Sequence, residues 1–224
     1  MHIGSQIIDL EPFDRAFAKL AGLVGDLRAA GHEISHVDLG GGLGVPYRTD
    51  NDPPPLPLEY AEIVKRHVAN LGCKVVFEPG RLIVANAGVL VSKVLYVKDT
   101  GDKVFVIVDA AMNDLIRPTL YEAWHDIRPV TESAGKPHVV ADIVGPVCES
   151  GDFMAQDRSI PAVVAGDLIA IASAGAYGAV QSGTYNTRAL VPEVLVKGDQ
   201  YAITRPRQSY EELIGMDRLP VWLA

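Results

Sequence analysis

The chain has 224 residues, of which 48% are hydrophobic and 21% are charged, and its formal net charge is −8 at pH 7. The acidic charge and the absence of any cluster of Lys and Arg argue against nucleic acid or an anionic membrane as the main partner. Two cysteines, Cys73 and Cys148, are too few for a disulfide scaffold, and neither a signal-peptide pattern nor a membrane-length apolar run occurs, so we expect a cytoplasmic protein.

The first 88 residues alternate between strand and helix patterns. In chain order we expect a strand at 3–8, a helix from Phe13 to about Gly31, a strand at 34–39, a helix at 60–72 and a strand at 75–77. Strands that alternate with helices through short loops pair in parallel. About three such units cannot close a barrel, for which eight are typical. We therefore expect a fragment of a longer protein.

Beyond about residue 88 the pattern becomes rich in short strands. Two strands flank a turn at 98–103 and predict a hairpin, and a Ser-Tyr-Glu-Glu segment at 209–212 predicts a capped final helix that ends at 214. The expected strands lie at 89–97, 104–109, 139–147, 167–172, 190–196 and 201–204. Together they predict an antiparallel sandwich or barrel-like β-domain.

Three glycines, Gly40, Gly41 and Gly42, follow an expected strand directly. Glycines at such a point let the backbone approach a ligand and aim successive N–H groups at a phosphate. Their spacing differs from that of the dinucleotide fingerprint. The alternative interpretation is a tight structural turn, which uses similar residues.

Two further segments also lie at strand ends. Glu78-Pro79-Gly80-Arg81 combines a carboxylate with a guanidinium, which together suit a cationic ring nitrogen and an anionic group. Taken alone, this pair is more typical of a surface ion pair. In the first segment His2 can stack on an aromatic cofactor and Ser5 can donate to a phosphate, although a lone His near a terminus is often incidental.

The β-rich part contributes five candidates of its own. Cys148 lies in a polar turn beside Glu149, which favours an exposed thiol with a role in proton transfer over a buried cysteine. Arg117 and Tyr121 are four residues apart and suit one carboxylate. Tyr177 lies between small residues. We find no grouping with metal-ligand spacing.

The order of these segments resembles the fold-type III pyridoxal-phosphate-dependent decarboxylases. The resemblance rests on His-Ile-Gly-Ser-Gln at 2–6, Asp-Leu-Gly-Gly-Gly-Leu-Gly at 38–44, Glu-Pro-Gly-Arg at 78–81, Cys-Glu-Ser-Gly-Asp at 148–152 and Ala-Tyr-Gly at 176–178. This family is similar to alanine racemase in fold. The resemblance implies that residues 1–88 form the last part of a pyridoxal-phosphate-binding (β/α)₈ TIM barrel, and that 89–224 form a carboxy-terminal β-domain whose last helix packs back toward the barrel.

The resemblance also implies a role for each residue of the cofactor site. His2 would stack on the pyridine ring, and Glu78 would keep the ring nitrogen protonated. Ser5 and Arg81, with the glycines Gly40, Gly41 and Gly42 and the Pro79-Gly80 turn, would hold the phosphate. Cys148 would return a proton to the substrate, acting in the partner subunit of a homodimer with active sites at the interface. Tyr177 would contact both cofactor and substrate.

Within the family, the Cys-Glu-Ser-Gly-Asp form resembles the diaminopimelate branch, which converts meso-2,6-diaminopimelate to L-lysine and CO₂ in the last step of lysine biosynthesis. The distal carboxylate and ammonium of that small amino acid suit Arg81, Arg117, Tyr121, Tyr177 and Glu149. The alternatives are a carboxynorspermidine, ornithine or arginine decarboxylase of the same fold, an inactive truncated partner of an intact decarboxylase, and a plain β-rich binding module.

One family feature is missing from the chain. The Schiff-base lysine of these enzymes lies in a Tyr-Ala-x-Lys-Ala type motif, and none of the lysines here has that context. We therefore expect this polypeptide alone to be inactive and the full-length enzyme to be the active form.

Overall fold

A computed structural model describes residues 1–50, 53–131 and 135–223 of the chain. The chain divides into two compact units. The first unit comprises Met1–Val89 and Ala172–Ala176, and the second unit comprises Leu90–Ile171 and Tyr177–Ala224.

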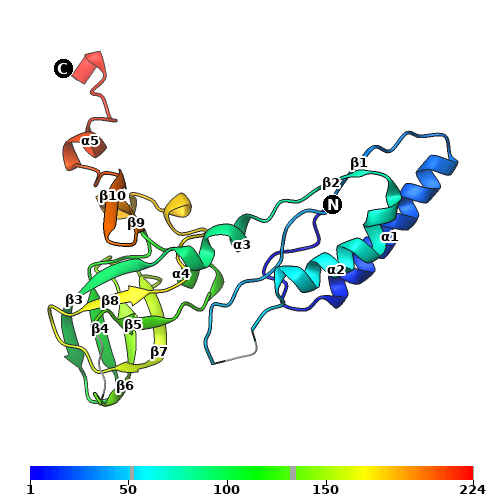
Figure 1. The fold of residues 1–224 in the computed structure, drawn as a ribbon. Coiled ribbons are helices and arrows are strands. Elements are labelled where there is room, and N and C mark those ends of the chain that lie inside the picture. The colour runs from blue at the N-terminus through cyan, green and yellow to red at the C-terminus, as the bar shows by residue number, and fades with distance from the viewer. Residues whose placement is uncertain (51–52, 132–134, 224) are drawn as a thin grey trace. The chain divides into compact units, whose positions relative to one another are not determined.

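The first unit alternates helices with two short strands (Figure 1). Its elements are α1 (Glu11–Ala29), β1 (His36–Asp38), α2 (Pro57–Val68), η1 (Ala69–Leu71), β2 (Lys74–Val76), α3 (Gly80–Val84) and η2 (Ala85–Ala87). Strands β1 and β2 pair in parallel, which confirms the predicted pairing. The expected strand at 3–8 is wrong. Only Ile7 bridges to Leu43, because Gly4 and Gln6 have φ angles of 145° and 56° that interrupt an extended backbone.

The core of the first unit lies between the two long helices and the strand pair. Helices α1 and α2 pack side by side (Figure 1). Phe13 and Phe17 are fully buried and meet the ring of Tyr60 edge-on, with centroids 5.0 and 5.7 Å away. Val37 and Leu39, from β1 and its end, belong to the same cluster. This packing fixes the point at which the chain leaves β1.

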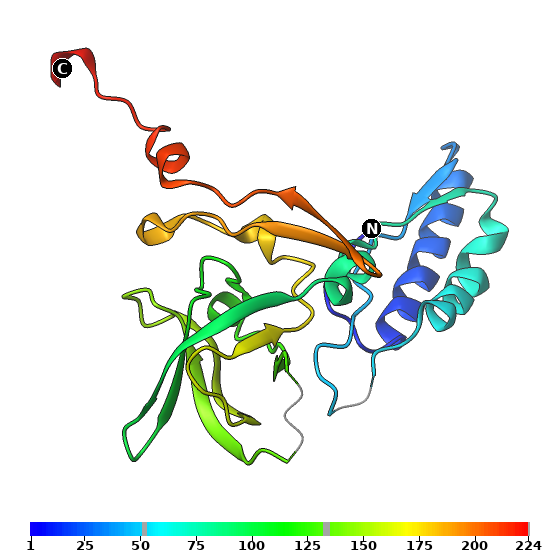
Figure 2. The ribbon, with the colours of Figure 1, turned by 60° about the vertical axis from the view of Figure 1, so that its left-hand side comes forward.

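The second unit is built on a six-stranded sheet with strand order β5-β8-β3-β4-β6-β7. The strands are β3 (Leu90–Asp99), β4 (Val104–Val108), β5 (Ile127–Pro129), β6 (His138–Val144), β7 (Phe153–Pro161) and β8 (Leu168–Ile171). The outermost strands β5 and β7 contact each other, so the sheet curls into a nearly closed, barrel-like form (Figure 2). The neighbouring strands pair antiparallel, as expected, except that β4 and β6 pair in parallel. A parallel pair needs a long crossover connection, and the segment between β4 and β6 contains α4 and β5.

The rest of the second unit consists of short elements. They are α4 (Arg117–Tyr121), η3 (Ala179–Gln181), η4 (Tyr185–Thr187), β9 (Glu193–Lys197), β10 (Gln200–Arg205), α5 (Tyr210–Ile214) and η5 (Val221–Leu223). The predicted hairpin β3–β4 is confirmed, and β9 and β10 also pair as an antiparallel hairpin. The predicted capping box of α5 is confirmed as well, since Ser209 and Glu212 bond each other's backbone N–H. Within the described residues, no helix is long and apolar enough to cross a membrane.

Candidate functional site

The carboxy ends of β1 and β2 lie beside each other in the first unit. The parallel pairing continues past both strands, since Leu39 N–H donates to the Val76 carbonyl at 3.0 Å and Glu78 N–H donates to the Gly40 carbonyl at 2.9 Å. A Cβ at Gly41 would overlap the Glu78 carbonyl oxygen. Only glycine permits this approach, so the three glycines and the Glu78 turn form one continuous surface.

The amino-terminal segment lies against the same strand ends. Gly42 accepts a hydrogen bond from Ile7 N–H at 2.9 Å, and a Cβ at Gly42 would overlap the Gly4 carbonyl oxygen. The side-chain amide of Gln6 bonds both backbone groups of Val45, donating to its carbonyl at 2.7 Å and accepting from its N–H at 3.2 Å. Three segments far apart in sequence, 1–7, 40–45 and 78–81, therefore converge.

A cation and two hydroxyls meet at this convergence. The guanidinium of Arg81 donates to Ser5 Oγ at 2.9 Å and to the hydroxyl of Tyr47 at 2.6 Å. His2 Nδ1 lies 3.4 Å from Gly41 N, which donates to it. Guanidinium and hydroxyl groups are the donors that proteins present to phosphate, so the chemistry of the cluster fits the phosphate of the expected cofactor.

Tyr47 was missed by the sequence analysis. Its only local signal is a phenol five residues after Gly42, in the loop that leaves the glycines. The pairing with Arg81 spans 34 positions and follows from the fold alone.

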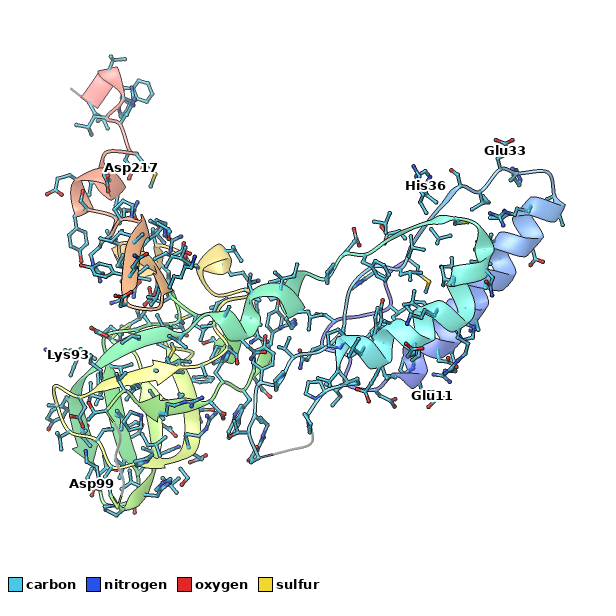
Figure 3. All side chains as sticks on the ribbon, in the orientation of Figure 1. Glu11, Glu33, His36, Lys93, Asp99 and Asp217 are labelled. Atoms are coloured by element: carbon cyan, nitrogen blue, oxygen red, sulfur yellow. The ribbon has the colours of Figure 1, made fainter. Side chains whose placement is uncertain are left out.

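The opposite end of β1 carries none of these groups. His36, labelled in Figure 3, is the first residue of β1, and Glu33 lies in the loop before it. No group of three or more His, Cys, Asp or Glu suited to a metal ion occurs in the part of the chain that the structure describes.

The loop between β6 and β7 in the second unit carries Cys148 and Glu149. The thiol of Cys148 is free and exposed. The carboxylate of Glu149 accepts from the hydroxyl of Tyr185 and from Gly151 N–H, both at 3.3 Å. The loop therefore presents an exposed thiol next to a carboxylate that two hydrogen bonds orient. Tyr185 is a second residue that the sequence analysis did not select.

Helix α4 of the second unit holds the other two predicted residues in different surroundings. Arg117 is buried, with 7% of its surface exposed, and its Nη1 lies 2.7 Å from Nε2 of the fully buried His125. Since a guanidinium only donates, His125 Nε2 is the acceptor of this bond. Tyr121 is 61% exposed.

Tyr177 begins the second segment of the second unit, directly after Ala176 in the chain. Its φ of 58° is left-handed, which is unusual for a residue with a large side chain. In the first unit, Ala176 packs with Val45 and Ala85, and Gly175 N–H donates to the Ala85 carbonyl at 3.1 Å. These contacts hold residues 172–176 beside η2.

The chain matches known proteins over most of its length. A family model described as "Pyridoxal-dependent decarboxylase, C-terminal sheet domain" matches residues 8–175. The diaminopimelate decarboxylase of Zymomonas mobilis is 53% identical over 222 residues, which are 99% of this chain and 52% of the relative. The Pseudomonas aeruginosa diaminopimelate decarboxylase is 51% identical over 218 residues, covering 97% of this chain and 52% of the relative.

The chain is also similar in structure to solved diaminopimelate decarboxylases. Diaminopimelate decarboxylase from Helicobacter pylori, complexed with L-lysine, superposes with a TM-score of 0.88 at 41% identity over 96% of this chain and 52% of that one. The enzyme from M. jannaschii, in co-complex with L-lysine, gives 0.89 at 37% identity over 100% and 52%. The chain thus spans about half the length of the relatives it matches. On the strength of the family match and these shared segments, the chain belongs to the pyridoxal-dependent decarboxylases.

Proposed function

We propose that this chain supplies the carboxy-terminal half of a diaminopimelate decarboxylase, which converts meso-2,6-diaminopimelate to L-lysine and CO₂. The observation that carries the proposal is the convergence of 1–7, 40–45 and 78–81, with Arg81 donating to Ser5 at its centre. Relatives at 45–53% identity that bear this name support the choice of substrate.

The first unit would hold the cofactor. When bound, pyridoxal phosphate supplies a protonated pyridine ring that accepts the electron pair left when CO₂ departs. Ser5, Arg81 and the backbone of Gly40–Gly42 would hold the phosphate. The carboxylate of Glu78 would keep the ring nitrogen protonated, and His2 would stack on the ring. In this proposal residues 1–88 are the last part of a (β/α)₈ barrel, and 89–224 are the β-domain that follows it.

The second unit would supply the proton donor and much of the substrate recognition. Cys148 would deliver the proton that replaces CO₂, because its thiol is exposed in a loop rather than buried in the core. Arg117 and Tyr121, together with Arg81 and Tyr177, suit the distal carboxylate of diaminopimelate, and Glu149 suits its ammonium. We further propose that the enzyme is a cytoplasmic homodimer in which Cys148 and Glu149 serve the partner's active site.

A hybrid enzyme tests this function. In the hybrid enzyme, this chain replaces the matching 222 residues of the Zymomonas mobilis relative, which retains the rest of its own sequence. With added pyridoxal phosphate and meso-diaminopimelate, we expect release of L-lysine, measured by chromatography. Decarboxylation of ornithine or arginine without release of lysine from diaminopimelate would contradict the proposed substrate.

The cofactor site is tested by Arg81→Met in the hybrid enzyme. Loss of charge-assisted bonds of about 1.5–3 kcal/mol should weaken pyridoxal phosphate binding by roughly 10- to 150-fold, measured by titration of the cofactor absorbance. Arg15→Met is the matched control. Its side chain is 70% exposed and its Nε lies 3.7 Å from Glu11 Oε1, so we expect cofactor affinity close to that of the unmodified hybrid enzyme.

A further inference from the structure

Asp152 is the last residue of the Cys-Glu-Ser-Gly-Asp segment at 148–152. Its carboxylate is among the few buried ones that the structure describes in the second unit. Only 4% of its surface is exposed. Its Oδ1 accepts from Met112 N–H at 2.6 Å, and its Oδ2 accepts from Val147 N–H at 2.6 Å. The two donors belong to separate segments. Met112 precedes α4, and Val147 immediately precedes Cys148.

The backbone next to Asp152 leaves space for its carboxylate group. A Cβ at Gly145 would overlap both carboxylate oxygens, so glycine is required there. Gly145 N–H also donates to the Asp152 carbonyl at 3.0 Å, and Asp152 N–H donates to the Glu149 carbonyl at 3.0 Å. Hydrogen bonds of both the main chain and the side chain of Asp152 thus join the two ends of the loop that carries Cys148 and Glu149.

The segment before α4 is tied to the same loop at other points. The hydroxyl of Thr119, on α4, donates to the Gly151 carbonyl. Asn113, next to Met112, donates from its side chain to the carbonyls of Gly183 at 3.0 Å and Tyr185 at 2.8 Å. The hydroxyl of Tyr185 in turn donates to the carboxylate of Glu149. Hydrogen bonds therefore link the segment before α4, the segment around Tyr185 and the Cys148–Glu149 loop to one another.

A carboxylate is the side chain that this position requires. Both oxygens of Asp152 accept, whereas asparagine offers one acceptor and would turn its NH₂ group toward the other N–H donor. Burying a charge is costly unless its hydrogen bonds are satisfied. Within the described residues, no cationic side chain forms an ion pair with Asp152, so the two backbone N–H groups stabilise the charge.

We propose that Asp152 is a positioning residue that fixes the Cys148–Glu149 loop relative to the α4 segment carrying Arg117 and Tyr121. It touches neither substrate nor cofactor and acts by holding two backbone segments at one distance. The inference rests on the proposed function, because it ties the Cys148–Glu149 loop, which would serve the partner's active site, to the segment that would bind the substrate's distal carboxylate. Misplacement of such groups by about 1 Å lowers rates by about 100-fold.

Asp152→Asn in the hybrid enzyme tests the positioning role. We expect kcat for lysine release to fall by roughly 10- to 100-fold, while the affinity for pyridoxal phosphate stays within about twofold, because the cofactor groups lie in the first unit. Amide hydrogen exchange at Met112 and Val147 should accelerate. Asp152→Glu, which keeps two acceptor oxygens, should recover part of the lost kcat. Asp102→Asn, in the exposed turn after β3, is the matched control and should leave kcat unchanged.

The outcomes separate the two proposals. Failure of the unmodified hybrid enzyme to release lysine would count against the proposed function, and amide exchange at Met112 and Val147 would still decide whether Asp152 holds the two segments. An active hybrid enzyme in which Asp152→Asn keeps its kcat would overturn the positioning role alone. Should Asp152→Asn not fold, Thr119→Val, which removes only the hydroxyl tie, decides instead. It should lower kcat about three- to tenfold, and an unchanged kcat would overturn the inference.

Discussion

Gly41→Ala should damage the proposed cofactor site without changing any side chain that we propose to bind the cofactor. The new Cβ would overlap the Glu78 carbonyl oxygen and lie 3.0 Å from its carbonyl carbon. The Glu78 backbone must then retreat by about 1 Å to reach ordinary van der Waals contact. Because the neighbour is backbone rather than a flexible side chain, we expect a loss of about 1–3 kcal/mol of stability, as for other overpacked sites.

The displacement should also reach Arg81, which we propose to bind the phosphate. Arg81 lies three residues after Glu78, and its guanidinium donates hydrogen bonds to Ser5 and Tyr47. A shift of this size at the Glu78 turn should weaken pyridoxal phosphate binding by about tenfold or more in the hybrid enzyme. The assays are thermal unfolding of the cofactor-free protein and titration with the cofactor.

The same substitution at Gly25 is the control. Gly25 lies in α1 with nothing within 4 Å of its Cβ position, so alanine there should stabilise the protein by about 0.5–1 kcal/mol and leave cofactor affinity unchanged. If Gly41→Ala unfolded at the wild-type temperature and bound the cofactor normally, the proposed close packing of the two strand ends would be refuted.

Three further predictions concern single groups. Tyr47→Phe in the hybrid enzyme removes the hydroxyl that accepts from Arg81 at 2.6 Å, so cofactor affinity should fall about threefold to tenfold in the same titration, and an unchanged affinity would argue against Tyr47 as part of the site. Burial raises the pKa of Tyr60 to about 12, so its NMR titration should lie about two units above that of the urea-unfolded protein, and a midpoint near 10 in the folded protein would contradict the packing of its ring. The hydrogen bond to Asp142 raises the pKa of Lys103, so this pair contributes stability that is fully present below pH 10.5 and is lost as the pH rises through the folded-state pKa. Urea unfolding should therefore show Lys103→Met to be less stable than wild type at pH 8 and equally stable above the folded-state pKa of Lys103. If the variant were still less stable above that pKa, the loss would come from packing and not from the charge pair.

Elements with a clear local pattern were predicted well. Apolar residues at helical spacing predicted α1. The helical turns after α2 continue through η1 and end, as expected, where Gly72 takes a left-handed φ of 64°. Strand β7 was missed because its sequence, Phe-Met-Ala-Gln-Asp-Arg-Ser-Ile-Pro, carries four polar residues in a row. Asp157 there has a φ of 46°, and the register with β6 shifts, so the expected alternation is lost. Strand β5 has three residues and ends in Pro129, which gives almost no signal.

The sequence also predicted part of the candidate site. It identified the candidate residues at the strand ends, because glycine runs and carboxylate–guanidinium pairs are recognisable within a few neighbouring positions. Local pattern likewise sets the helices, the turns and the caps, because each depends on residues at most a few positions apart. The contacts of Arg81 with Ser5 and Tyr47, of Arg117 with His125, and of Asp152 with Met112 were decided by the tertiary structure. They join residues 8 to 76 positions apart, and a hydrogen bond across such a distance exists only after packing has brought both ends together.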